Sequence, residues 1–166
     1  GLPEEKLRAF GIPVAKSCRR EISREDARRK LGLDPDGKYF LAAGGSMGAG
    51  DLSELVEKLL EETSTEKILV ICGSNKKAEQ KLKKQFAEES RTQILGFTTQ
   101  MPLYLKACNV LFTKPGGLTS TEAAVVGVPM IHTAPIPGCE TVNRKFFTKA
   151  GMSWSAMTLK GQVEKG

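Results

Sequence analysis

The sequence is poor in several residue types that particular protein classes require. Aromatic residues make up 6% of its 166 residues, which argues against the base-stacking surfaces of proteins that bind single-stranded nucleic acid. No apolar run approaches the roughly 18 residues of a membrane-spanning helix, and the first residues lack the basic-then-apolar pattern of a signal peptide. The four cysteines form no C-x-x-C pair, so we expect reduced thiols rather than a zinc finger. We therefore expect a globular protein with no nucleic-acid partner.

Acidic residues are scarce from residue 96 onward. The net charge is +6, and residues 96–166 carry seven basic side chains against three acids, Glu122, Glu140 and Glu164. A basic surplus of this size suits nucleic acid, an anionic membrane surface or a phosphorylated ligand, and it also fits a plain solvated surface. Because acids are so rare here, each of them is a candidate for a specific role.

Short apolar runs alternate with helical stretches along the chain, which predicts an α/β fold. We expect a Rossmann-like parallel sheet with right-handed crossovers and helices on both faces. Residues 1–22 are predicted to be a lead-in, and residues 23–166 one domain whose first helix is capped by Ser23. The expected strands are 39–43, 68–72, 92–95, 109–112 and 128–131, and the later helices lie near 52–60, 78–86, 103–107, 120–126 and 143–150.

Glycines follow each predicted strand, at the sheet edge where ligands of such folds bind. A ring of glycines at one edge indicates a ligand that lies against bare backbone, although each alone could simply relieve a tight turn. They are Gly44, Gly45, Gly48 and Gly50, then Gly73, Gly96, Gly116 and Gly117, and finally Gly138.

Two of these glycine turns lead into helices, in residues 44–51 and 114–122. The first is neither a P-loop, because Asp51 and Leu52 stand where Lys and Ser or Thr are needed, nor a G-x-G-x-x-G fingerprint. Each turn still offers free backbone N–H groups and the positive end of a helix dipole to a phosphate. Two such turns facing one ligand predict a diphosphate site, whereas one alone could be structural.

Several polar residues lie beside these turns. Glu122, just inside a helix, could accept two vicinal hydroxyls or only stabilise the helix N-terminus. Glu140 and Asn143 are three apart on the first turn of the next helix, which suits sugar hydroxyls or plain capping. His132 is the only histidine, and we interpret it as a packed, hydrogen-bonded residue rather than a base. Cys139 has no companion histidine in its motif, which argues against a nucleophile.

Five motifs in order resemble a known family across residues 11–152. The chain is similar to the C-terminal, donor-binding half of GT-B glycosyltransferases, in particular monogalactosyldiacylglycerol synthases and processive diacylglycerol glucosyltransferases. It resembles more distantly the N-acetylglucosaminyltransferase that makes lipid II. The motifs are Gly44-Gly45-Ser46-Met47-Gly48, Cys72-Gly73-Ser74-Asn75-Lys76, Gly96-Phe97-Thr98 with Met101, Lys114-Pro115-Gly116-Gly117-Leu118-Thr119 with Glu122, and Pro135-Ile136-Pro137-Gly138 with Glu140 and Asn143.

The resemblance assigns a role to each matching residue. It implies that Phe97 and Met101 contact uracil, that Glu122 binds the ribose, and that Glu140 and Asn143 bind the sugar. Cys139 stands where many relatives have Gln, which weakens any inference about the sugar. Gly73 and Asn75 are further candidates. The diphosphate contacts would be Gly44, Gly45, Ser46, Met47, Gly48, Gly117, Leu118 and Thr119.

The resemblance also implies an activity for the longer protein. It would be an inverting enzyme that transfers galactose or glucose from a UDP-sugar to diacylglycerol, cytoplasmic and peripheral on the inner face of the cell membrane. The acceptor site and the general base would belong to a missing N-terminal domain, so we expect an excised domain or fragment with no catalytic residue, metal or cofactor of its own. The alternatives are a non-catalytic nucleotide-sugar-binding subunit completed by a partner chain, and a UDP-sugar epimerase.

Overall fold

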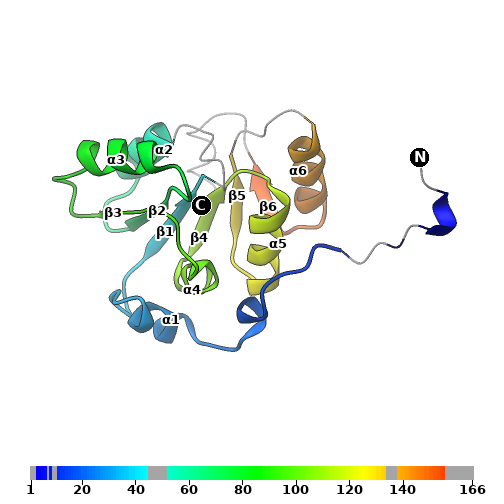
Figure 1. The fold of residues 1–166 in the computed structure, drawn as a ribbon. Helices are drawn as coiled ribbons and strands as arrows, with labels where there is room; N and C mark the ends of the chain where they lie inside the picture. Colours follow the sequence, from blue (N-terminus) through cyan, green and yellow to red (C-terminus); the bar gives the residue numbers. More distant parts are fainter. Residues whose placement is uncertain (1–2, 7, 9–10, 45–51, 134–137, 156–166) are drawn as a thin grey trace.

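A six-stranded parallel sheet forms the centre of the protein (Figure 1). The computed structural model describes residues 3–6, 8, 11–44, 52–133 and 138–155. The strand order is β3-β2-β1-β4-β5-β6, so β1 and β4 are neighbours. From β1 to β3 the strands are added toward one side of the sheet, and from β4 to β6 toward the other side. The strands are β1 Tyr39–Ala43, β2 Lys67–Ile71, β3 Thr92–Leu95, β4 Val110–Thr113, β5 Met130–His132 and β6 Ser153–Ser155.

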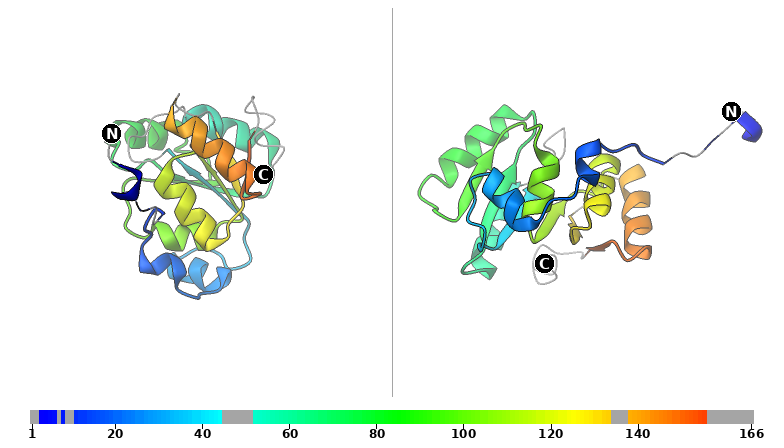
Figure 2. Two further views of the ribbon diagram at one scale, coloured as in Figure 1. Left: turned by 90° about the vertical axis from the view of Figure 1, so that its right-hand side faces the viewer. Right: turned by 90° about the horizontal axis from the view of Figure 1, so that it is seen from below.

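Helices cover both faces of the sheet. Leu41, Leu69 and Leu111 of the strands pack in one core with α4, α5 and α6, and Figure 2 shows α5 and α6 side by side on this face. Val70 and Phe112, which point the other way, pack against α2 and α3. The helices are α1 Arg24–Lys30, α2 Leu52–Glu62, α3 Lys76–Gln85, α4 Met101–Ala107, α5 Gly117–Val126 and α6 Cys139–Lys149, with two short 3-10 helices, η1 Glu4–Lys6 and η2 Lys16–Arg19.

The predicted fold class is confirmed, and the five predicted strands are found within one or two residues. Ser23 caps α1 as expected, because its hydroxyl accepts a hydrogen bond from the Asp26 amide at 3.0 Å. The strand β6 was not predicted, since Ser153-Trp154-Ser155 contains a single apolar residue. The helices α5 and α6 begin three and four residues earlier than predicted, so the residues that precede the expected helices form their first turns.

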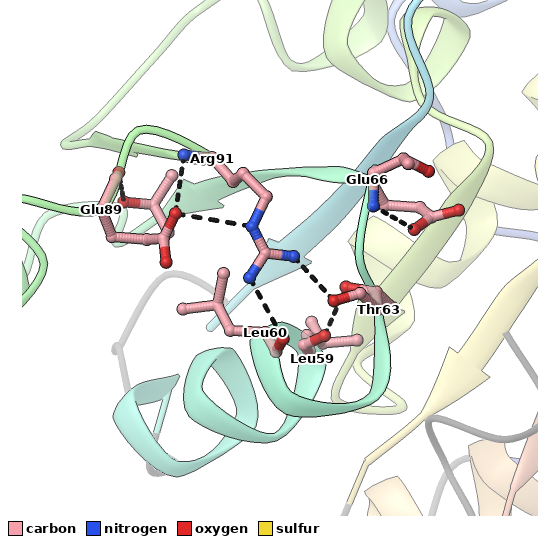
Figure 3. A network of polar contacts seen from close by, with 8 residues as sticks. Leu59, Leu60, Thr63, Glu66, Glu89 and Arg91 are labelled. Carbon is pink, nitrogen blue, oxygen red and sulfur yellow. Dashed lines mark hydrogen bonds and ion pairs between the residues drawn. The ribbon is translucent and has the colours of Figure 1, made fainter.

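Two arginines, one buried and one half-buried, make contacts at the sheet edge opposite the strands' carboxyl ends. The guanidinium of Arg91 donates to the carbonyl oxygens of Thr63, at 2.8 Å, and Leu60, at 3.1 Å, which joins the start of β3 to the end of α2 (Figure 3). Arg28 of α1 donates to the carbonyl of Ala107 at 2.9 Å and to Asn109 Oδ1 at 3.0 Å. Ligands of such folds bind at the opposite edge, at the carboxyl ends of the strands. No helix of the described residues is long and apolar enough to cross a membrane.

Candidate functional site

A cavity of about 220 Å³ opens at the carboxyl ends of β1 and β2. Ala43 and Ile71 are the last residues of these strands, so the cavity lies where a parallel sheet of this kind binds its ligands. Its lining contains Gly73, Phe97, Met101 and Thr119 of the predicted site, together with Ala43, Ile71, Ser74 and Thr98. Ser74 and Thr98 belong to two of the matching motifs but were given no contact, and Ala43 and Ile71 were not predicted, although their places at strand ends were a usable signal.

Phe97 and Met101, the predicted uracil contacts, both line the cavity. The side chain of Phe97 follows β3 and is 75% exposed, which excludes a role in the core. Met101 is the first residue of α4 and is half-buried. An exposed aromatic ring beside an apolar cavity offers a flat surface on which a heterocyclic base can stack.

The N-terminus of α5 meets the same cavity through Thr119. Gly116 is the N-cap residue, and the first backbone hydrogen bond into the helix runs from the Ser120 amide to the Gly116 carbonyl at 3.3 Å. The amides of Gly117, Leu118 and Thr119 precede this bond and point out of the helix end. This arrangement can bind an anion beside the cavity that holds the base.

The predicted glycine loop after β1 lies mostly outside the described residues, which include Gly44 but not Gly45, Ser46, Met47 or Gly48. Gly44 is buried, and its amide donates to the carbonyl of Ile71 at 3.3 Å. That amide therefore extends the pairing of β1 with β2. Because β1 pairs with β4, Ala43 at the end of β1 lies beside Thr113 at the end of β4, from which the chain leads into α5.

Glu122 lies one helical turn beyond Thr119 on α5, so the two residues share a side of the helix. It is half-buried, and this burial raises the pKa of its carboxyl group. Its charge also helps raise the pKa of the Cys18 thiol on η2, for which burial is the larger cause. Among the described residues, Glu122 does not line the cavity. Its ribose contact stays a prediction.

Glu140 and Asn143 lie in the first part of α6. The side-chain amide of Asn143 donates to the carbonyl of Pro115 at 3.0 Å, and its nitrogen is 3.9 Å from the position that a Cβ on Gly117 would take. Asn143 therefore contacts the loop before α5, whereas the described lining of the cavity includes neither residue. Their sugar contacts stay predictions.

Of the two further candidates, Gly73 lines the cavity and Asn75 caps a helix. Gly73 has a φ of 60°, a backbone conformation that favours glycine, and it stands two positions after the end of β2. The Asn75 side chain accepts a hydrogen bond from the Ala78 amide at 3.0 Å, which satisfies the N-terminus of α3. The structure thus gives Asn75 a capping contact.

His132 is fully buried at the end of β5, as a packed residue. Its Nε2 lies 3.0 Å from Ser120 Oγ, and its Nδ1 lies 3.0 Å from Ser153 Oγ. Burial, with a smaller effect of the Arg144 charge, lowers the pKa of His132 to about 4. The interpretation of His132 as a hydrogen-bonded structural residue is confirmed.

The acidic residues that the structure describes do not gather into a metal site. The described residues contain no group of three or more His, Cys, Asp or Glu side chains that could hold a metal ion. The D-x-D sequence Asp34-Pro35-Asp36 precedes β1, at the other edge of the sheet, where the Asp36 amide donates to Asp34 Oδ1 at 3.0 Å. Cys139 is exposed at the start of α6.

Comparison with known proteins identifies the family. Residues 40–156 match the glycosyltransferase family 28 C-terminal domain. The chain belongs to this family. It is 30% identical over 166 residues to the processive diacylglycerol beta-glucosyltransferase of Staphylococcus saprophyticus and 32% identical over 165 residues to that of Staphylococcus carnosus. Each alignment covers 99% of this chain and 42% of the relative, so the chain spans about two fifths of the length of these proteins.

Solved structures of glycosyltransferases share the fold. MurG of Acinetobacter baumannii superimposes with a TM-score of 0.67 at 22% identity, over 98% of this chain and 48% of MurG. WaaG, a glycosyltransferase of lipopolysaccharide biosynthesis, gives 0.72 at 16% identity over 98% of this chain and 46% of its own. Anabaena HepE, solved with UDP and glucose, superimposes with a TM-score of 0.69 at 15% identity, over 93% of this chain and 43% of HepE. The resemblance to the diacylglycerol glucosyltransferases and the GT-B architecture are confirmed.

Proposed function

We propose that this chain binds the UDP-sugar donor of an enzyme that transfers a hexose to diacylglycerol. The observation that carries the proposal is the cavity at the ends of β1 and β2, whose lining includes Phe97, Met101 and Thr119 of the α5 N-terminus. An apolar cavity fits uracil, and the adjoining helix N-terminus fits the diphosphate. The names of the Staphylococcus relatives favour glucose as the sugar and diacylglycerol as the acceptor.

The proposed reaction is an inverting displacement. A general base in another part of the longer protein takes the proton from an acceptor hydroxyl, whose oxygen forms a bond to the anomeric carbon while the bond from that carbon to UDP breaks. The chain's own contribution is to hold the nucleotide and to stabilise the negative charge that develops on the departing UDP. The amides and dipole of α5 can supply that stabilisation. Because diacylglycerol is a membrane lipid, we propose that the longer protein works at the inner face of the membrane.

Calorimetric titration of the chain with UDP, UDP-glucose and ADP tests the proposal. The described part of the site lies on one domain and is open on one side, so we expect weak binding of UDP and UDP-glucose, with Kd on the order of 0.1–1 mM. ADP should bind more weakly than UDP. Phe97→Ala should weaken UDP binding, whereas Lys81→Ala, an exposed substitution outside the site, should leave it unchanged. Equal affinity for UDP and ADP, or no binding of either, would contradict the assignment.

The division of labour between this chain and the rest of the protein is tested separately. We expect the chain alone to bind UDP-glucose without multiple-turnover transfer to diacylglycerol, as measured by release of UDP and by lipid chromatography. Turnover by the chain alone would refute it. The same assay on the longer protein distinguishes a transferase, which makes a glycolipid, from an epimerase, which makes a second UDP-sugar.

A further inference from the structure

A chain of three polar side chains runs beneath the first turns of α5. The ring of His132 is 0% exposed and joins Ser120 of α5, at 3.0 Å from Nε2, to Ser153 of β6, at 3.0 Å from Nδ1. Ser120 is also fully buried, and Ser153 is 3% exposed. The ring therefore links α5, β5 and β6 through contacts that water does not reach.

The three groups are chemically complementary. Burial lowers the pKa of His132 to about 4, so the ring is neutral near pH 7 and has one nitrogen that donates and one that accepts. A serine hydroxyl can do either, so both ring nitrogens are satisfied without a charge in the core. The edge of the ring also packs against Phe147 of α6, with ring centroids 5.7 Å apart, which holds its orientation.

The fully buried side chains of α5 are small, while Ala124 and Val126 are partly buried against the same core. The buried residues of α5 are Ser120 and Ala123, whereas α2 buries Leu52, Leu55, Val56 and Leu59. The C-terminal end of α5 is fixed by the left-handed cap at Gly127. Near the N-terminal end, Ser120 and His132 form a buried hydrogen bond, and Thr119, which lines the cavity, is the residue next to Ser120. The Ile12 side chain also lies here, 3.1 Å from the position that a Cβ on Gly117 would take.

We propose that the Ser120–His132–Ser153 chain fixes the N-terminus of α5 in the position that binds the donor diphosphate, with His132 as a positioning residue. This inference rests on the proposed function, because it concerns the same site. The three hydrogen-bonded side chains lie behind the helix and would not contact the ligand themselves. A change at Ser153, on the far strand β6, should therefore reach the ligand through the ring.

Two serine variants and a matched control test the inference. We expect Ser120→Ala and Ser153→Ala to weaken UDP binding roughly three- to ten-fold, the effect of losing one hydrogen bond, and to leave uridine binding unchanged because uridine has no diphosphate. Thr121→Val is the control. It also removes a hydroxyl from α5, but that hydroxyl is bonded to the Gly117 carbonyl within the helix, at 2.6 Å, and the variant should bind UDP like the unaltered chain.

The ring of His132 provides a readout that needs no variant, because it is the only histidine of the chain. Its ¹⁵N resonances should be those of a neutral tautomer, and UDP or pyrophosphate should shift them whereas uridine should not. No shift with either diphosphate, or serine variants that bind UDP like the unaltered chain, would overturn the inference while leaving the proposed function intact. Failure of the unaltered chain to bind UDP would instead overturn the proposed function, and the inference with it.

Discussion

The side-chain amide of Asn143 in α6 donates a hydrogen bond to the backbone carbonyl of Pro115, 3.0 Å away, in the loop before α5. This contact ties α6 to the loop from which the α5 N-terminus emerges. It uses one of the two N–H donors of the side-chain amide, so Asn143 could contact a sugar hydroxyl through Oδ1 or through the second N–H. Asn143 thus has a bracing contact whether or not it also binds the sugar.

We expect Asn143→Asp to weaken UDP and UDP-glucose binding to a similar extent, by roughly 1–2 kcal/mol. The substitution replaces the donor by a carboxylate oxygen that faces the Pro115 carbonyl, which should displace the loop beside the predicted diphosphate site. Calorimetric titration with both ligands measures the effect. A loss confined to UDP-glucose would show that sugar contact, and not bracing, is the main role.

Glu122→Ala should weaken UDP binding by roughly 1.5–3 kcal/mol, the range for a hydrogen bond to a charged group. A carboxylate beside a diphosphate repels it, and two ribose hydroxyls donated to Glu122 would offset that repulsion. The affinity of the variant for pyrophosphate, which has no ribose, should change little, and calorimetric titration of both ligands provides the comparison. If Glu122 only stabilises α5, the variant will instead melt at a lower temperature and bind UDP as before.

Arg28→Ala should lower the free energy of unfolding by roughly 2–4 kcal/mol, because it leaves buried acceptors without a donor. The Arg28 side chain donates to the carbonyls of Ala107 and Pro35 and to Asn109, and it is 5% exposed. Arg29→Ala is the control. Its partner is the exposed Asp26, so it should cost less than about 1 kcal/mol in urea unfolding. Similar losses for the two variants would contradict the bracing role of Arg28.

The stability of the protein should fall as the pH drops from about 6.5 toward 4. The pKa of His132 is about 4 in the folded chain, against about 6.5 for an ordinary histidine, so in this interval the unfolded state binds the additional proton. The stabilisation is complete above about pH 6.5 and is lost at up to about 1.4 kcal/mol per pH unit below it. Urea unfolding across this interval measures the slope.

His132→Gln supplies the comparison, because glutamine can make two hydrogen bonds but does not titrate. The difference in unfolding free energy between the two proteins should shrink as the pH falls. A constant difference across the interval would show that His132 does not account for the pH dependence.

The sheet and the cavity were largely predictable from the sequence. Continuous apolar runs such as Ile68–Cys72 indicate buried parallel strands, and the positions just after the strands are the edge where the cavity forms. Phe97 and Thr119 could be selected because Phe97 follows Gly96 at the end of a strand and Thr119 stands two positions after Gly117. The family resemblance added the role of each. The position of each strand and of its end follows from residues that are neighbours in the sequence.

The polar contacts behind the site could not be predicted in the same way. Ser120, His132 and Ser153 are separated by 12 and 21 positions, and which hydroxyls meet the ring depends on how α5 and β6 pack. β6 itself has too few apolar residues to give a strand signal. The use of the Asn143 amide depends likewise on a contact 28 positions away.

The central pairing of β1 with β4 has a kinetic consequence. Thr113 donates to the carbonyl of Ala43 across 70 positions of sequence, at 3.0 Å, in the middle of the sheet. Closing so long a loop lowers the conformational entropy of the chain before the stabilising contacts of the pair form. Formation of this pair should therefore limit the rate of folding. During synthesis, β1 can pair with β2 as soon as both have emerged, but its other edge stays open until β4 is made. A nascent chain that stalls before β4 therefore exposes an unpaired apolar strand edge, which is the stage at which it is most prone to aggregate.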